Sequence, residues 1–123
     1  MKIERFEDLE VWNLSRRLVN CIYKMTNNEN FSRDFGLVNQ MQRCSVSIMS
    51  NIAEGFERKG KKEFIHFLYT AKGSCGELRS QLYIALDLNY IDRTKFDESY
   101  NLSETVSKLI SGLIKHLQTF LEP

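Results

Sequence analysis

The chain has 123 residues, of which 42% are hydrophobic and 27% charged, and this composition fits one compact soluble domain over residues 1–123. The formal net charge of +1 excludes a protein whose whole surface attracts polyanions. No apolar run approaches the roughly 20 residues of a membrane span and the N-terminus lacks the hydrophobic region of a signal peptide, so we expect a cytoplasmic protein with no membrane partner.

Helical periodicity predicts a first helix over residues 8–25, with Asp8 as its N-cap. The following residues 26–34 are rich in side chains that favour turns, and we expect Phe31 to fold back and close the end of a bundle. The apolar residues of the first helix recur three and four positions apart and are Leu9, Trp12, Leu18, Val19, Ile22 and Tyr23.

Two long helices are predicted in the middle of the chain, joined by a short basic loop. The second helix spans residues 35–54, and we expect Gly55 to end it as a C′ glycine. The third spans residues 61–88 and contains Gly73 and Gly76, each of which costs about 1 kcal/mol in a helix interior relative to alanine. Because glycine is unfavourable in a helix interior, its presence there indicates the close approach of a neighbouring backbone.

A fourth helix is predicted over residues 94–121, again with apolar side chains at helical spacing. The only proline is the last residue, so none of these helices is interrupted. Short connections make consecutive helices antiparallel. We therefore predict an all-α fold, an up-and-down antiparallel four-helix bundle.

The second predicted helix carries a polar stripe beside its apolar stripe. Antiparallel pairing about the basic loop places Gln40 opposite Glu77 and Arg43 opposite Ser74, so we expect a charge-assisted network in which Arg43 also reaches Glu77. Two interpretations stay open: the polar residues are buried and fix the helix register, or part of the stripe faces a groove or an oligomer channel and meets a ligand. The predicted polar network comprises Gln40, Arg43, Ser47, Asn51, Glu54, Ser74 and Glu77.

A modest basic patch lies in and around the loop between the second and third helices. Residues 37–62 hold five cations against Glu54 and Glu57, a balance of +3, while the rest of the chain sums to −2. Such a patch either contacts nucleic acid or simply caps a helix and keeps the loop soluble. The candidate nucleic-acid contacts are Arg43, Arg58, Lys59, Lys61 and Lys62.

Signals for catalysis, metals and cofactors are weak. The three cysteines are far apart at apolar helical positions, which favours small buried thiols kept reduced. Glu63 and His66 form one Glu-x-x-His pair, but a di-iron bundle needs a second. No glycine-rich phosphate loop follows a strand. We therefore expect no enzyme, no catalytic residue, no metal, no cofactor and no small-molecule substrate.

Three segments carry a resemblance to a known family. They are residues 6–12 (FEDLEVW), residues 47–55 (SIMSNIAEG) and residues 63–78 (EFIHFLYTAKGSCGEL). In this order they resemble the bacterial four-helix bundle family named for the intervening sequences of 23S ribosomal RNA. The resemblance implies a ring-like homopentamer without enzymatic activity. The chain is also similar to the accessory proteins of diversity-generating retroelements, whose basic pentamers bind a reverse transcriptase and nucleic acid.

The chain departs from the family pattern at three positions. Gln42 stands where members often have an arginine, Met49 where they have a proline, and Ser32 where they have the proline of a Phe-Pro pair. The loss of an arginine weakens the local positive field, so a useful field depends on several copies of the chain.

Two functions are compatible with these features. In the first, a non-enzymatic homo-oligomer, a homopentamer by resemblance, acts as a scaffold that contacts RNA or an RNA-bound, reverse transcriptase-like protein through the basic patch. In the second, the oligomer is purely structural or protein-binding. Aromatic side chains on more than one face, Trp12, Tyr69, Tyr83 and Tyr90, favour self-association in both.

Overall fold

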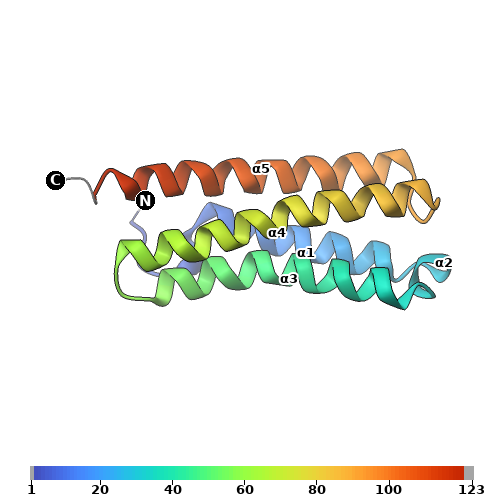
Figure 1. The fold of residues 1–123 in the computed structure, drawn as a ribbon, viewed down its shortest axis with the longest axis horizontal. Coiled ribbons are helices and arrows are strands. Elements are labelled where there is room, and N and C mark those ends of the chain that lie inside the picture. The colour runs from blue at the N-terminus through green and yellow to red at the C-terminus, as the bar shows by residue number, and fades with distance from the viewer. Residues whose placement is uncertain (1, 121–123) are drawn as a thin grey trace.

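A computed structural model describes residues 2–120 and contains four long helices (Figure 1). Successive long helices run in opposite directions, which confirms the predicted all-α, up-and-down antiparallel bundle. The elements in chain order are η1 (Phe6–Asp8), α1 (Glu10–Thr26), α2 (Glu29–Ser32), α3 (Phe35–Glu57), α4 (Lys61–Asp87) and α5 (Arg93–Gln118).

Each long helix packs against two others. α3 lies between α1 and α4, and α5 closes the bundle by packing on both α4 and α1. The core is made of aliphatic side chains at helical spacing, each of which contributes about 1.5–3 kcal/mol through burial. Fully buried members include Leu18, Ile22, Met41, Ile48, Ile52, Leu68, Leu78, Leu82 and Ile110.

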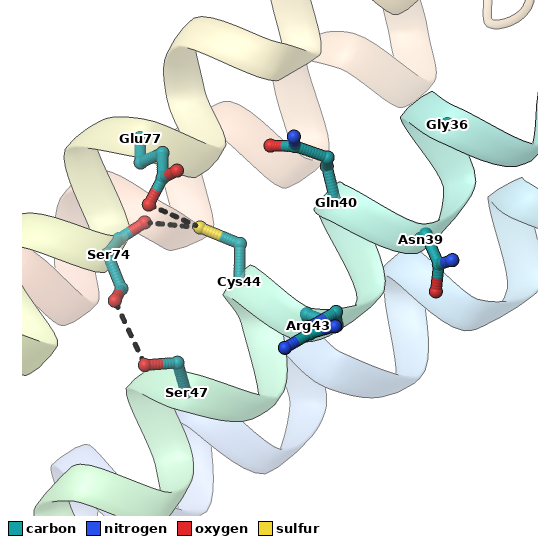
Figure 2. Close-up of a pocket in the computed structure, with 8 residues that line it drawn as sticks. All are labelled: Gly36, Asn39, Gln40, Arg43, Cys44, Ser47, Ser74 and Glu77. Atoms are coloured by element: carbon teal, nitrogen blue, oxygen red, sulfur yellow. Dashed lines mark hydrogen bonds between the residues drawn. The ribbon is translucent and has the colours of Figure 1, made fainter.

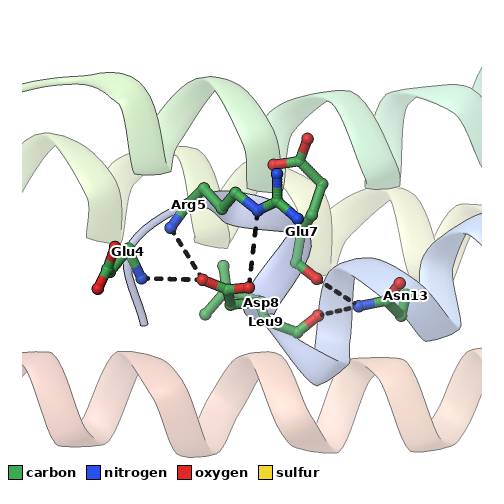
Figure 3. Close-up of polar contacts among 6 residues, drawn as sticks. All are labelled: Glu4, Arg5, Glu7, Asp8, Leu9 and Asn13. Carbon is green, nitrogen blue, oxygen red and sulfur yellow. Dashed lines mark hydrogen bonds and ion pairs between the residues drawn. The ribbon is translucent and has the colours of Figure 1, made fainter. Parts of the chain in front are cut away.

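The predicted role of Asp8 as the N-cap of the first helix is wrong. Asp8 instead ends the short helix η1, and Leu9 is the N-cap of α1. The Asp8 carboxylate accepts hydrogen bonds from the backbone amides of Glu4 (3.0 Å) and Arg5 (3.2 Å), as Figure 3 shows. These bonds, first that from Glu4, lower the pKa of Asp8. Asp8 therefore fixes the segment that precedes it, because those amides have no helical partner.

The prediction that Phe31 closes the end of the bundle is confirmed. Phe31 is fully buried and stacks on Tyr90, with 4.9 Å between ring centroids. The Tyr90 hydroxyl donates to Asp34 (3.0 Å), which raises the pKa of Tyr90, and Asp34 also caps α3 through the Leu37 amide. Within this segment, expected to be rich in turns, Asn28 caps the single helical turn α2.

Gly55 does not end the second long helix, contrary to the prediction. α3 continues through it to Glu57, and the turn falls at Gly60, whose φ of 100° suits glycine. A Cβ at position 55 would lie 2.7 Å from Phe67 Cβ and 3.0 Å from Phe64 Cδ1. Glycine is therefore required here because α4 passes so close.

Gly73 and Gly76 do not mark a close backbone contact, contrary to the prediction. A Cβ at Gly73 would meet no atom within 4 Å, and one at Gly76 would meet only the Arg79 guanidinium, at 3.8 Å. α4 otherwise matches its predicted bounds to within one residue. α5 begins after the N-cap Asp92 and ends at Gln118, and the predicted end at residue 121 lies outside the described residues.

Within residues 2–120, none of the helices combines the length and the apolar character that crossing a membrane requires.

The contact at Gly55 predicts a specific loss of stability. In a Gly55→Ala variant the new methyl group overlaps Phe67, so we expect the free energy of unfolding to fall by about 1–3 kcal/mol. Urea unfolding followed by circular dichroism measures the change.

Gly73→Ala is the matched control, since it is the same substitution in the neighbouring helix with open space around the new methyl group. We expect it to raise stability by about 0.5–1 kcal/mol, because glycine is unfavourable in helices. A Gly55→Ala variant at least as stable as the wild type would contradict the close packing of α3 on α4.

Candidate functional site

A hollow lies between α3 and α4, and we call it the α3/α4 groove. It has a volume of about 620 Å³ and is open to solvent along one side. Figure 2 shows that both helices contribute side chains to it. The lining residues are Gly36, Asn39, Gln40, Arg43, Cys44, Ser47, Ser74 and Glu77.

Hydrogen bonds across the groove join the two helices at its centre. The hydroxyl groups of Ser47 and Ser74 are 3.1 Å apart, and the Asn51 amide donates to the Ser47 carbonyl (2.8 Å) and hydroxyl (3.0 Å). The Cys44 thiol donates to the Ser74 carbonyl at 3.1 Å and lies 3.5 Å from Glu77 Oε1. The thiol acts as a weak donor in these contacts. The hydroxyl and amide groups of the stripe are therefore already hydrogen-bonded within the chain.

The expected pairing of α3 with α4 is wrong by one helical turn. Ser47, rather than Arg43, meets Ser74, and Gln40 accepts a hydrogen bond from Gln81 (3.2 Å) rather than facing Glu77. The shift follows from the continuation of α3 through Gly55, which moves the turn toward Gly60.

The expected network of Gln40, Arg43, Ser74 and Glu77 does not form within the described residues. Arg43 and Glu77 are both exposed, and no ion pair joins them in the part of the chain that the structure describes. The central contacts of the polar stripe thus join hydroxyl, amide and thiol groups rather than a buried ion pair.

The cysteines near the groove are poor nucleophiles. Burial, and after it the nearby charge of Glu77, raises the pKa of the Cys44 thiol from its ordinary 9.0 to about 12. Burial raises the pKa of Cys75 to about 11. Since the thiolate is the reactive form, neither thiol is activated at neutral pH. All three cysteines are free.

Sequence analysis missed Gln81, which lines a second hollow beside the groove. This hollow of about 390 Å³ shares Gly36 and Gln40 with the groove and adds Leu37, Gln81 and Ile84. Gln81 is buried on the core face of α4 next to Leu82. The sequence did hold a signal for Gln81, because it is a polar residue at a core position of the helix. A buried polar side chain needs hydrogen-bond partners, and this points to a specific contact.

The basic loop lies at the other end of the α3/α4 hairpin, and its arginine is already engaged. Arg58 pairs with Glu54 (2.8 Å) and Glu63 (3.8 Å), and its guanidinium carbon lies 5.0 Å from the centroid of the Phe67 ring. Glu54 therefore belongs to this cluster and not to the groove.

Three lysines of the loop remain exposed. Lys59, Lys61 and Lys62 make no ion pair with any described residue, and Lys61 lies over the Phe120 ring at 5.5 Å. Arg43 lies 15 residues before Arg58 on α3, about 22 Å away at about 1.5 Å per residue. The candidate nucleic-acid contacts thus divide into a lysine cluster at the loop and a distant arginine in the groove.

No three His, Cys, Asp or Glu side chains within residues 2–120 converge in a way that could hold a metal ion. The groove and the loop instead present hydrogen-bonding groups and separate charges.

Comparison with known proteins finds one matching family model and a solved structure with a similar fold. The family model described as 23S rRNA-intervening sequence protein matches residues 7–112. Among solved structures, the chain is similar to a crystal structure of a protein with unknown function from the S23 ribosomal protein family of Bacteroides thetaiotaomicron, with 25% sequence identity and a TM-score of 0.78. That likeness covers 85% of this chain and 95% of the other. A comparison with curated proteins finds no match.

The environment of Cys44 predicts slow thiol chemistry. At pH 8 we expect a disulfide reagent to label partly buried Cys21 first and to label Cys44 and Cys75 at least about 10-fold more slowly, as mass spectrometry of the peptides would show. Denatured protein, in which all three thiols react alike, is the control. Labelling of Cys44 in the folded protein as fast as Cys21 would contradict the buried, protonated thiol.

The same pKa shift fixes the sign of a pH effect. The folded pKa of Cys44 is raised, so its contribution to stability is complete below the unfolded value of 9.0 and is lost as the pH rises toward about 12. A Cys44→Ala variant should therefore lose less stability between pH 8 and pH 10.5 than the wild type does.

Proposed function

The chain belongs to the 23S rRNA-intervening sequence protein family, and from that premise we propose that it is a non-enzymatic, self-associating helical scaffold that contacts RNA, or a protein bound to RNA, through its loop lysines. The resemblance supplies the number five for the oligomer and a reverse transcriptase as the kind of RNA-bound partner. The cluster Lys59, Lys61 and Lys62 is the observation that carries the RNA part of the proposal.

The loop lysines suit phosphate contact because they are exposed and free of acidic partners among the described residues. Arg58, in contrast, is held by two carboxylates and an aromatic ring, so its role is to brace the turn. Among the described residues, one copy of the chain offers three loop cations without an ion pair at this end of α3 and α4. Self-association multiplies that field and increases phosphate binding, since each contact adds a salt-dependent increment.

A purely protein-binding or structural oligomer is the second candidate, and the opposite end of the bundle favours it. Phe35, Ile84 and Leu88 are 78%, 46% and 51% exposed near the start of α3 and the end of α4. Exposed apolar side chains gathered in one region are typical of protein interfaces. This candidate needs no RNA contact.

Removal of the lysine cluster distinguishes the two functions. We expect wild-type protein to retain a structured RNA at low salt and the variant Lys59→Gln, Lys61→Gln, Lys62→Gln to bind more weakly. The slope of log affinity against log salt should fall by about one for each lysine that contacts a phosphate. Fluorescence anisotropy across a salt series measures both quantities.

The matched control replaces three exposed lysines elsewhere, Lys24, Lys95 and Lys108, by glutamine, which changes the net charge equally. It should leave the salt slope close to that of the wild type. If the wild type retains no RNA at low salt, or if both variants lose the same slope, the loop has no specific part in RNA binding and the second candidate stands.

A further inference from the structure

A small hollow opens at the turn between α3 and α4, beside the basic loop. Its volume is about 230 Å³, and its lining residues are Phe56, Arg58, Gly60, Lys61 and Phe64. All five are exposed or only partly buried, so a ligand can reach the hollow from solvent. Pockets for drug-sized ligands have roughly 300–1,000 Å³, so this hollow suits one small ring system.

Two aromatic rings form the apolar part of the hollow. The rings of Phe56 and Phe64 are nearly perpendicular, with 89° between their planes and 5.9 Å between their centroids. A flat group that stacks on the face of one ring therefore meets the edge of the other, and aromatic systems favour both contacts. Both side chains pack against the core, so the fold holds the rings in place before any ligand binds.

Cations lie in and beside the same hollow. The Arg58 guanidinium is held by two carboxylates, but it has five N–H donors and keeps some of them for the polar edge of a ligand. Lys61 also lines the hollow, and Lys59 and Lys62 lie next to it in the chain. A planar ligand in the hollow would therefore have ammonium groups on either side.

A further aromatic ring lies exposed beside these lysines. Phe120 is 61% exposed, and the Lys61 ammonium lies 5.5 Å from the centroid of its ring. The end of α5 and the α3–α4 turn lie at the same end of the bundle (Figure 1). Exposed aromatic rings beside cations are the surfaces on which proteins stack the bases of single-stranded nucleic acids.

We propose that the hollow binds one unpaired base of an RNA strand while the loop lysines contact the neighbouring phosphates. The inference rests on the proposed RNA contact and narrows its ligand to single-stranded RNA, because the bases of a duplex are already stacked on one another. Stacking supplements a weak field, since Glu57 is exposed and makes no ion pair among the described residues. Each copy of the chain carries the whole hollow, so a ring of five copies would present five of them.

An abasic strand separates base binding from phosphate binding. We expect fluorescence anisotropy to show that the wild type binds single-stranded oligoadenylate at least about fivefold more tightly than an abasic strand with the same number of phosphates, because stacking acts only on bases. Adenosine monophosphate should compete poorly, since it lacks the neighbouring phosphates. A mononucleotide that binds as tightly as the strand would overturn RNA as the ligand.

Replacement of one ring tests the hollow itself. Phe56→Leu keeps an apolar side chain and removes the aromatic face, so the preference for oligoadenylate over the abasic strand should fall at least about threefold. The salt slope should not change, because no charge is lost. Tyr23→Leu is the matched control, since it removes an aromatic side chain that is 45% exposed near the end of α1 and should leave the preference unchanged.

Ultraviolet crosslinking of the wild-type complex gives a second measurement that does not depend on how a variant folds. Mass spectrometry should place the crosslinked base on Phe56 or Phe64, and the same strand in a duplex should give no crosslink there. Crosslinks confined to other residues would overturn the base site. Equal binding of the two strands, with a salt slope that the triple lysine variant flattens, overturns the base site and leaves the proposed RNA contact standing. A wild type that binds neither strand at low salt overturns both.

Discussion

The close contact of Gly55 with Phe64 and Phe67 sets the level at which α3 and α4 face each other. Since a side chain at this position would push the helices apart, the contact depends on the missing Cβ. It lets α3 run on to Glu57, and it moves the turn to Gly60. This register of α3 against α4 brings Ser47 into hydrogen-bond contact with Ser74, and Gln40 into hydrogen-bond contact with Gln81.

The same register determines which charges are engaged and which remain free. Arg58 lies within reach of Glu54, Glu63 and the Phe67 ring, so the one arginine of the loop stabilises the turn. Arg43 and Glu77 are left facing solvent on the groove. Among the described residues, a chain with a net charge of only +1 thus keeps its loop lysines without acidic partners at one end, and the unpaired side chains of Arg43 and Glu77 on one face. The fold separates surfaces that composition alone cannot distinguish.

Periodicity predicted the four long helices and their buried faces, because apolar spacing directly reflects which side of a helix meets the core. The turn-favouring composition of residues 26–34 placed Phe31 at the bundle end, because an aromatic side chain among turn residues needs a core to pack against. Glycine was harder to interpret. The sequence suggests that Gly55 ends a helix and that Gly73 allows close packing. Gly55 is instead the close-packing site and Gly73 lies in open space, since the position of the neighbouring helix decides whether a side chain fits.

The polar stripe shows where sequence reasoning stops. Residues such as Ser47 and Asn51 were correctly placed on one line of α3, but their partners depend on a register that loop length predicts only to within a turn. Asp8 has the composition of an N-cap and nevertheless binds the amides of Glu4 and Arg5. In both cases the residue type predicted that the side chain would form hydrogen bonds. Which group became its partner depended on how other parts of the chain pack.

The even number of long helices has a practical consequence for any attachment made to this chain. The start of α1, the end of α5 and the α3–α4 turn all lie at one end of the bundle, as Figure 1 shows. A fluorescent protein or a surface anchor fused through either α1 or α5 would therefore crowd the loop lysines and leave the opposite end, with Phe35 and Leu88, facing outward. An internal tag in the α4–α5 connection would reverse that orientation, so the two placements report on different ends of the same molecule.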